Sequence, residues 1–171
     1  MLQETNILSK EHPFLSGKGM GVRLPIIKQV PPERVGGKIL FVGTDGRFYN
    51  AKGRELKPHF NQAMQRRKKG DYPCMSNFCN RLCHHLVYET FVGPRTKGME
   101  IDHINGNKLD WSLDNLQEVT PAENRKRARI LRIMRRCAEM DNDPSLLPVN
   151  RSRAELLSIF ATYDFMKGDK L

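Results

Sequence analysis

The chain has 171 residues, and its 29 Lys and Arg against 19 Asp and Glu give a formal net charge of +10 with a pI near 9.7. This length predicts one domain with appended arms and excludes a large multidomain machine. The sequence has no run of about 18 apolar residues and does not begin with the basic-then-apolar pattern of a secretory signal, so we expect a soluble cytoplasmic protein without a membrane span. The positive charge favours a polyanionic partner, nucleic acid first.

The first half of the chain divides into an arm and a β-rich module. Residues 1–37 are punctuated by glycine and proline, which predicts a flexible basic arm. From residue 38, short apolar runs at 39–42 and 47–50 flank the turn signal Asp45-Gly46. The pattern predicts a β-meander, and we assign residues 38–81 to this module.

Four consecutive cations follow the meander, before an expected strand over 72–78. They are Arg66, Arg67, Lys68 and Lys69. Such a run is either a solvated loop or a loop that contacts phosphate, and its place between strands leaves both interpretations open.

The pattern over residues 82–141 predicts a helix, two short strands and a second helix. The first helix covers 82–91, and the strands cover 99–103 and 116–120. A long polar loop with the turn signal Asn105-Gly106 separates the strands. This order brings the end of the first strand close to the first turn of the second helix.

The second helix has the best defined start. Thr120, Pro121 and Glu123 supply the hydroxyl cap, the proline at the first helical position and the acid of a capping box. Helical spacing predicts an apolar side formed by Ile130, Ile133, Met134 and Cys137. A separate stripe consists of Arg125, Arg129, Arg132 and Arg136. Seven Lys and Arg against one acid over 121–137 favour backbone binding in a DNA groove over an ordinary solvated face.

The end of the chain is predicted to be a helical tail. Residues 142–148 break the basic helix, and residues 151–165 predict one more amphipathic helix, so we assign 142–171 to this tail. Together these segments predict an α+β fold, with a small upstream β-meander, a strand-strand-helix core and a basic C-terminal helix.

Two oxygen-bearing side chains in the core are candidate metal ligands. Asp102 supplies an anionic oxygen and Asn124 a neutral one, which suits Mg²⁺ or a similar ion that keeps most of its positions for water and phosphate. Asn124 stands in the first helical turn, where an Asn is a poor helix former and gains nothing from capping.

His103 is the candidate general base, because its unperturbed pKa suits proton transfer near neutral pH. Adjacent residues of a regular strand point to opposite faces, so Asp102 and His103 can serve one phosphate only if the strand ends or bulges there. An Asp-His pair alone is more often a surface or capping arrangement. Asn115 is best explained as a structural residue whose amide ties the loop backbone.

The cysteines do not form a zinc motif. Cys74, Cys79 and Cys83 lack paired C-x2-C spacing, which favours reduced, buried thiols over a zinc site. Nearby, His84 has two open interpretations, a packing or hydrogen-bonding role first and phosphate contact second.

IDHINGNKLDWSLDNLQEVTPAEN at 101–124 resembles the ββα-metal core of HNH endonucleases of the phage and intron homing type. CHHLVYETFVG at 83–93 is similar to the helix before that core, and residues 39–58 are similar to a small β-module that often precedes it. The resemblance covers residues 38–130. It implies a metal ligand at Asp102, a general base at His103, a structural Asn at Asn115 and a final metal ligand at Asn124, and it places a commonly seen histidine at His84.

The resemblance implies a DNA endonuclease that hydrolyses a phosphodiester bond with His-activated water and one Mg²⁺ or Mn²⁺ ion. We expect a monomer that acts on double-stranded DNA in a bacterial or phage-infected cell, with residues 38–81 contacting the DNA. The alternative is a non-cutting nucleic-acid-binding or architectural protein on the same scaffold. Homing relatives often add a C-terminal helix-turn-helix, whereas this sequence predicts only one short helix over 151–165.

Overall fold

The computed structural model describes residues 24–60 and 72–166, and they form a mixed α and β fold. A four-stranded antiparallel sheet comes first, in the order β1 (Ile27–Gln29), β2 (Leu40–Gly43), β3 (Phe48–Asn50) and β4 (Glu55–Leu56). We call it the upstream sheet. Its strands β2 to β4 are the expected meander.

Part of the segment expected to be a flexible arm is folded. Ile27 pairs with Gly43 and Gln29 pairs with Phe41, so β1 is an edge strand of the upstream sheet. A 3-10 turn, η1 (Pro32–Arg34), then leads into β2. The expectation of an arm over 1–37 was therefore wrong for these residues, because cross-strand pairing with β2 supplies order that the local sequence does not signal.

A small second sheet links the upstream sheet to the first helix. It contains β5 (His59–Phe60), β6 (Pro73–Met75) and β7 (Arg81–Leu82), and β7 runs directly into α2 (Cys83–Phe91). The strand expected over 72–78 is limited to β6, because the chain turns after Met75, where Phe78 N–H donates to the Met75 carbonyl.

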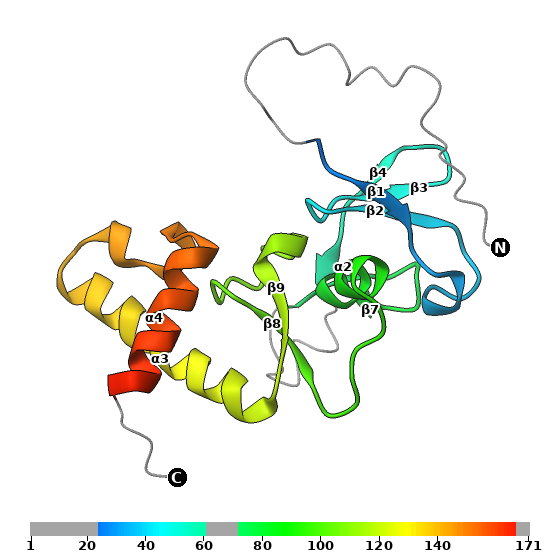
Figure 1. Ribbon diagram of the computed structural model, residues 1–171. Coiled ribbons are helices and arrows are strands. Elements are labelled where there is room, and N and C mark those ends of the chain that lie inside the picture. Colours follow the sequence, from blue (N-terminus) through cyan, green and yellow to red (C-terminus); the bar gives the residue numbers. More distant parts are fainter. Residues whose placement is uncertain (1–23, 61–71, 167–171) are drawn as a thin grey trace.

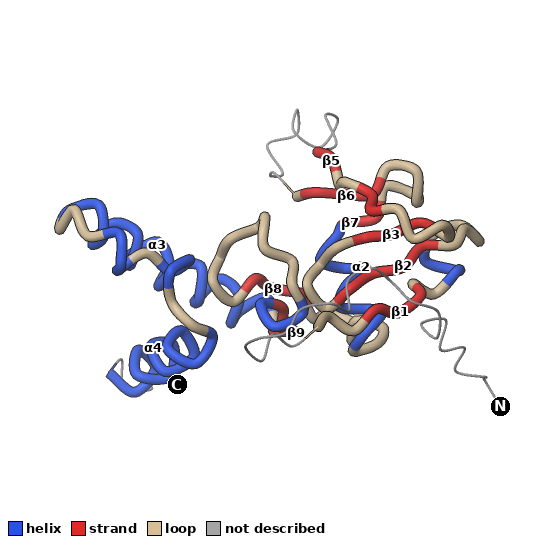
Figure 2. Tube along the Cα trace, turned by 90° about the horizontal axis from the view of Figure 1, so that it is seen from above, coloured by secondary structure: helices blue, strands red, loops and turns tan. Residues whose placement is uncertain are grey.

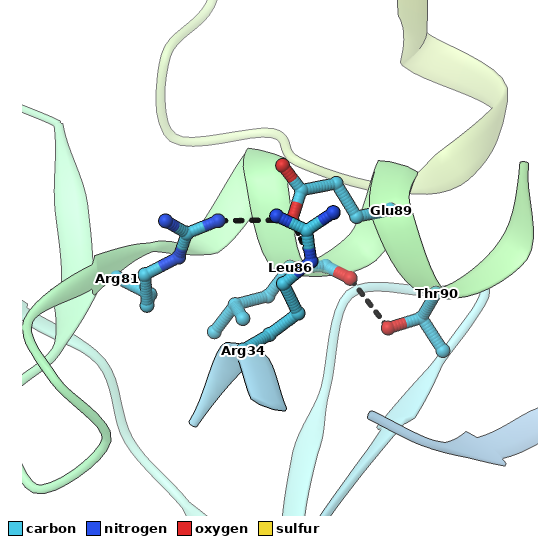
Figure 3. Close-up of polar contacts among 5 residues, drawn as sticks. All are labelled: Arg34, Arg81, Leu86, Glu89 and Thr90. Atoms are coloured by element: carbon cyan, nitrogen blue, oxygen red, sulfur yellow. Dashed lines mark hydrogen bonds and ion pairs between the residues drawn. The ribbon is translucent and has the colours of Figure 1, made fainter. Parts of the chain in front are cut away.

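An ion-pair cluster fixes α2 to the segments before it. The Glu89 carboxylate on α2 lies 3.3 Å from Arg34 Nε of η1 and 2.9 Å from Arg81 Nη2 of β7 (Figure 3). The Glu89 side chain is only 8% exposed, so it accepts both guanidinium groups in a largely dry setting. This contact holds η1, which lies in the segment expected to be a flexible arm, against α2.

The hairpin β8 (Glu100–His103) and β9 (Leu116–Val119) follows, with η2 (Leu113–Asn115) just before β9. The long helix α3 (Pro121–Met140) leaves β9, and the short turns η3 (Pro144–Leu146) and η4 (Pro148–Asn150) lead to α4 (Arg153–Met166). The hairpin lies between the β-rich half with α2 and the α3–α4 pair (Figures 1 and 2).

Two hydrophobic clusters flank the hairpin. The larger one joins the upstream sheet, α2 and the hairpin, and includes Leu40, Phe48, Leu86, Ile101 and Leu116. The smaller one joins the end of β8 to α3 and α4, and its buried members are Ile104, Ile130, Leu131, Leu156 and Phe160. The hairpin therefore has a packed layer on each side, which gives its side chains fixed directions.

The helix α3 starts as predicted, with Pro121 at its first position and the Thr120 hydroxyl accepting the Glu123 N–H at 3.2 Å. Its apolar side differs from the prediction. Ile133 is 46% exposed and Cys137 is exposed, whereas Leu131 and Ala138 are buried. The reason is tertiary, because α4 and the β8–β9 turn pack against the side of α3 that carries Ile130 and Leu131.

The upstream sheet is tied to the loop of the hairpin. Trp111 Nε1 donates to the Gly46 carbonyl at 2.7 Å, and Leu113 N–H donates to the Thr44 carbonyl at 2.8 Å. Gly46 has a φ of +83°, and a Cβ there would lie 2.6 Å from Trp111 Cδ1. Only glycine fits this close approach, which fixes the β2–β3 turn against the hairpin loop.

Among the described helices, none is long and apolar enough to cross a membrane.

Candidate active site

The two candidate catalytic residues lie at the end of β8 and face opposite sides of the hairpin. Asp102 pairs with Gln117 and His103 pairs with Leu116, and the antiparallel register continues without interruption to His103. The strand then ends, because Gly106 N–H donates to the His103 carbonyl at 2.7 Å and closes a turn. The sequence left open whether the strand ends or bulges at this point, and in the structure it ends.

Asp102 lies on the side of the hairpin that faces α3. Glu100, two residues earlier on the same strand, shares that face. Asn124 Nδ2 on α3 donates to Glu100 Oε2 at 2.7 Å, and Gln117 Nε2 lies 3.4 Å from Asp102 Oδ2. The fold therefore brings Asp102 and Asn124 to one face, with Glu100 beside both.

The carboxyl group of Asp102 has an unusual pKa. Burial raises the pKa of Asp102 to about 6, the charge of Glu100 adds to this, and the Arg127 guanidinium acts in the opposite direction. Burial makes this carboxylate costly to ionise, and a nearby positive charge would lower that cost. Arg127 stands one helical turn after Asn124, and its Nη1 is buried without a hydrogen-bond partner among the described residues.

His103 lies on the other face, towards α2. Its ring is 3% exposed and lies 4.9 Å from the His84 ring and 6.0 Å from the Tyr72 ring, centroid to centroid. Within residues 24–60 and 72–166, His103 Nε2 has no hydrogen-bond partner. Burial lowers the pKa of His103 to about 4, so the imidazole is neutral at physiological pH, which is the form that accepts a proton.

Tyr72 lies beside the histidines on the α2 side of the hairpin. Its ring lies 5.1 Å from the His84 ring, centroid to centroid, and the Lys108 ammonium lies 4.4 Å from the centroid of the Tyr72 ring. Burial and the charges of Asp102 and Glu100 raise the pKa of the Tyr72 phenol.

Asn115 has the contacts that a structural role requires. It is buried, its Oδ1 accepts the Asn105 N–H at 3.0 Å, and its Nδ2 donates to Asn105 Oδ1 at 2.9 Å and to the Asp110 carbonyl at 2.7 Å. These bonds fix the loop between the strands directly after His103.

His84 is buried inside a cluster of rings and faces no open surface. It contacts Tyr72, His103 and His85, and burial lowers its pKa to about 2. This setting favours the packing interpretation over phosphate contact.

The predicted cationic positions on α3 are all on the surface. Arg125, Arg129, Arg132 and Arg136 are exposed. The loop of Arg66, Arg67, Lys68 and Lys69 lies outside the described residues. In the part of the chain that the structure describes, no three His, Cys, Asp or Glu side chains gather as metal ligands. Cys83 is a buried thiol and Cys79 an exposed one, and the buried Sγ of Cys74 lies 3.7 Å from His59 Nε2.

Three residues near the site were not identified from the sequence pattern. Glu100 could have been found, because the two-residue spacing from Asp102 puts it on the same strand face. Arg127 was grouped with the general basic character of α3, and only the contact of α3 with β8 distinguishes it. Tyr72 arrives from the segment before β6, and no local pattern connects it to the hairpin.

Comparisons with known proteins show what this segment of the chain is similar to. Residues 81–126 match the family model described as HNH endonuclease, which confirms the resemblance over this segment. The chain is 44% identical over 55 residues to YosQ, a SPbeta prophage-derived protein of Bacillus subtilis (strain 168) named as an HNH homing endonuclease. The 55 aligned residues cover 32% of this chain and 32% of that protein.

A second relative is Protein 3.8 of Escherichia phage T7, 51% identical over 41 residues, which cover 24% of this chain and 34% of that protein. The chain thus spans about a third of the length of both curated relatives. Among solved structures, it is similar to the HNH homing endonuclease I-HmuI, from work on DNA binding and cleavage, with a TM-score of 0.46 and 22% identity over 68% of each chain.

Proposed function

We propose that this chain is a divalent-metal-dependent DNA endonuclease that cuts one strand of a duplex. The observation that carries the proposal is the placement of Asn124 from α3 on the strand face that holds Asp102, next to the end of the strand where His103 stands. The family match over residues 81–126 supports the reaction class.

The side chains present fit a hard divalent ion. Asp102 and Asn124 offer oxygen donors of the kind that Mg²⁺ and Mn²⁺ prefer, and the raised pKa of Asp102 marks a carboxylate in need of a positive partner. Asp102 and Asn124 would hold the ion, and a bound ion supplies charge stabilisation at the scissile phosphate and the departing 3′ oxygen.

His103 acts as the base. Its neutral imidazole takes a proton from water as the water oxygen bonds to phosphorus, and the P–O3′ bond breaks to leave a 5′-phosphate and a 3′-hydroxyl that takes a proton from solvent. Asn115 holds the loop that follows His103, so the imidazole keeps its direction. One such site in a monomer gives a nick.

Cations on several elements would hold the duplex. The exposed arginines of α3 offer phosphate contacts, as do the cationic loop at 66–69 and the β-rich module at 38–81. The upstream sheet is bonded to the hairpin loop through Trp111, so DNA held on the sheet would have a fixed position relative to His103.

The burial of His103 favours a second candidate. A ring that is 3% exposed suits a non-cutting DNA-binding protein that keeps the scaffold for stability alone. The two candidates differ in chemistry and share DNA binding, so an assay of strand cutting separates them.

The test is nicking of supercoiled plasmid with Mg²⁺ or Mn²⁺ by wild type, Asp102→Ala and His103→Ala. Asp114→Ala is the matched control, because Asp114 is an exposed carboxylate near the hairpin loop. We expect wild type and the control to nick, and both site variants to lose at least about a hundredfold in rate, since a general base alone contributes that much. Wild type that shifts DNA in a gel but leaves plasmid intact with both metals would establish the non-cutting candidate.

A further inference from the structure

A carboxylate with no assigned role lies two residues before Asp102. Glu100 stands on β8, half-buried, with its side chain on the same face of the hairpin as Asp102. Its Oε2 accepts a hydrogen bond of 2.7 Å from Asn124 Nδ2, so a strand residue contacts the amide of the proposed helix ligand.

This contact decides which end of the Asn124 amide is available. An ionised carboxylate can only accept hydrogen bonds, so the amide must turn its NH₂ end towards Glu100 and its oxygen away from it. A hard divalent ion is bound through the amide oxygen and never through the NH₂ group. Without Glu100, rotation of the amide by half a turn would present the wrong end.

We propose that Glu100 is a positioning residue that orients the Asn124 amide so that Oδ1 faces the divalent ion. The inference rests on the proposed function, because it needs an ion at Asp102 and Asn124. Groups that hold a metal ligand in its binding orientation commonly change metal affinity about tenfold to a hundredfold when they are removed.

A purely structural tie between β8 and α3 is the competing explanation, and the helix already has other anchors. Thr120 caps its start, Ile130 and Leu131 are buried against Ile104, and Arg135 Nη2 donates to the Gly106 carbonyl at 2.9 Å. The contact of Glu100 is with the side-chain amide of Asn124 and not with the helix backbone. Its loss should therefore affect the amide more than the placement of α3.

The test measures Mn²⁺ binding to the full chain by titration calorimetry, without DNA. We expect Glu100→Ala to weaken the affinity about tenfold or more. Glu100→Gln, which keeps an acceptor oxygen of the same reach, should recover most of that loss. Glu139→Ala is the control for net charge, because it removes an exposed carboxylate near the C-terminal end of α3. This variant should bind Mn²⁺ as wild type does. Should Glu100→Ala fail to fold, Glu100→Val removes the acceptor and suits a strand.

A double-mutant cycle identifies the route of the effect. Asn124→Asp replaces the amide with a carboxylate that presents an oxygen in either rotation, so Glu100→Ala should weaken Mn²⁺ binding no further in that background. The same loss in both backgrounds would overturn the proposal, because Glu100 would then act independently of the amide. Wild-type affinity in Glu100→Ala would overturn it as well, and so would equal losses in the Ala and Gln variants, which indicate direct ligation.

The failure of this inference can be told apart from failure of the proposed function. If wild type binds Mn²⁺ but nicks no plasmid, the nuclease proposal fails and the affinities of the Glu100 variants still decide the role of that residue. If wild type binds no Mn²⁺ up to millimolar concentration but nicks plasmid, the inference about Glu100 is overturned and the nuclease proposal stands. If wild type neither binds Mn²⁺ nor nicks plasmid, both proposals are overturned.

Discussion

From its burial, we expect the ionised Asp102 carboxylate to lower the stability of the metal-free protein at neutral pH. Burial holds the pKa of its carboxyl near 6, so above that pH the folded state contains a poorly solvated negative charge. A divalent ion would offset this unfavourable term. Such a stability cost is common among binding and catalytic carboxylates.

Asp102→Asn tests this directly. Because the folded pKa lies above that of an unfolded Asp, the penalty is present at high pH and disappears as the pH falls below the unfolded value near 4. We expect the metal-free variant to gain up to about 3 kcal/mol in unfolding free energy at pH 7.5, at roughly 1.4 kcal/mol per pKa unit, and less at pH 5.

Urea unfolding at both pH values measures the change. Asp114→Ala serves as the control, because its exposed carboxylate gives no reason for a pH-dependent gain. A variant of Asp102 that is less stable than wild type at pH 7.5 would show that the carboxylate is already compensated in the metal-free protein.

Among the elements, η1, β7 and α2 depend on one shared carboxylate. The Glu89 carboxylate forms ion pairs with both Arg34 and Arg81 (Figure 3). Removing this carboxylate leaves the two guanidinium groups without that partner. The two arginines are 30% and 33% exposed, so water can reach them in part and the loss stays below that of a fully buried pair.

We expect Glu89→Ala to lower the unfolding free energy by about 2 kcal/mol, which is below the range for a fully buried pair. Glu33→Ala is the matched control, since Glu33 is an exposed acid on η1 itself. Chemical denaturation at pH 7 compares the two. Equal stabilities would mean that the ion pairs of Glu89 do not contribute to holding η1 in place.

The sequence was informative about elements that carry their own signals. The Thr120-Pro121 start of α3 and the Asp45-Gly46 turn were both predicted, because caps and turns depend on a few adjacent residues. β1 gave no such signal, since Ile27, Lys28 and Gln29 are all exposed and are ordered only by pairing with β2. The apolar side of α3 was misplaced for a related reason, because the local pattern does not show which side of α3 is covered by α4.

Part of the site was predictable on the same terms. Asp102 and Asn124 were expected to come together from the order of strands and helix, and the structure brings them to one face. Tyr72 and Arg127 were not foreseen, because their proximity to Asp102 arises from tertiary contacts between separate elements. The assignment of catalytic and metal-binding roles stays a prediction.

At the scale of the whole molecule, part of the net charge of +10 is carried by exposed arginines of α3. Arg125, Arg129, Arg132 and Arg136 lie exposed along α3, the helix that also carries Asn124. A DNA phosphate backbone bound along α3 would therefore lie close to the proposed metal site.

Replacing these four arginines with alanine should weaken DNA binding and flatten its salt dependence. Each lost phosphate contact lowers the slope of log K against log salt by about 0.9. The same four positions changed to lysine form the control, because lysine keeps the charge. A gel-shift series between low and high salt measures both. An unchanged slope in the alanine variant would show that α3 does not contact the phosphate backbone.

The proposed reaction requires a divalent ion, and we propose that Asp102 binds it. The most direct measurement is the single-turnover nicking rate as a function of Mg²⁺ concentration, with plasmid DNA saturated by protein, for wild type and Asp102→Ala. We expect a saturating Mg²⁺ dependence for wild type and a rate at least about a hundredfold lower at every Mg²⁺ concentration for the variant. Equal rates and equal Mg²⁺ dependence in the two proteins would contradict it.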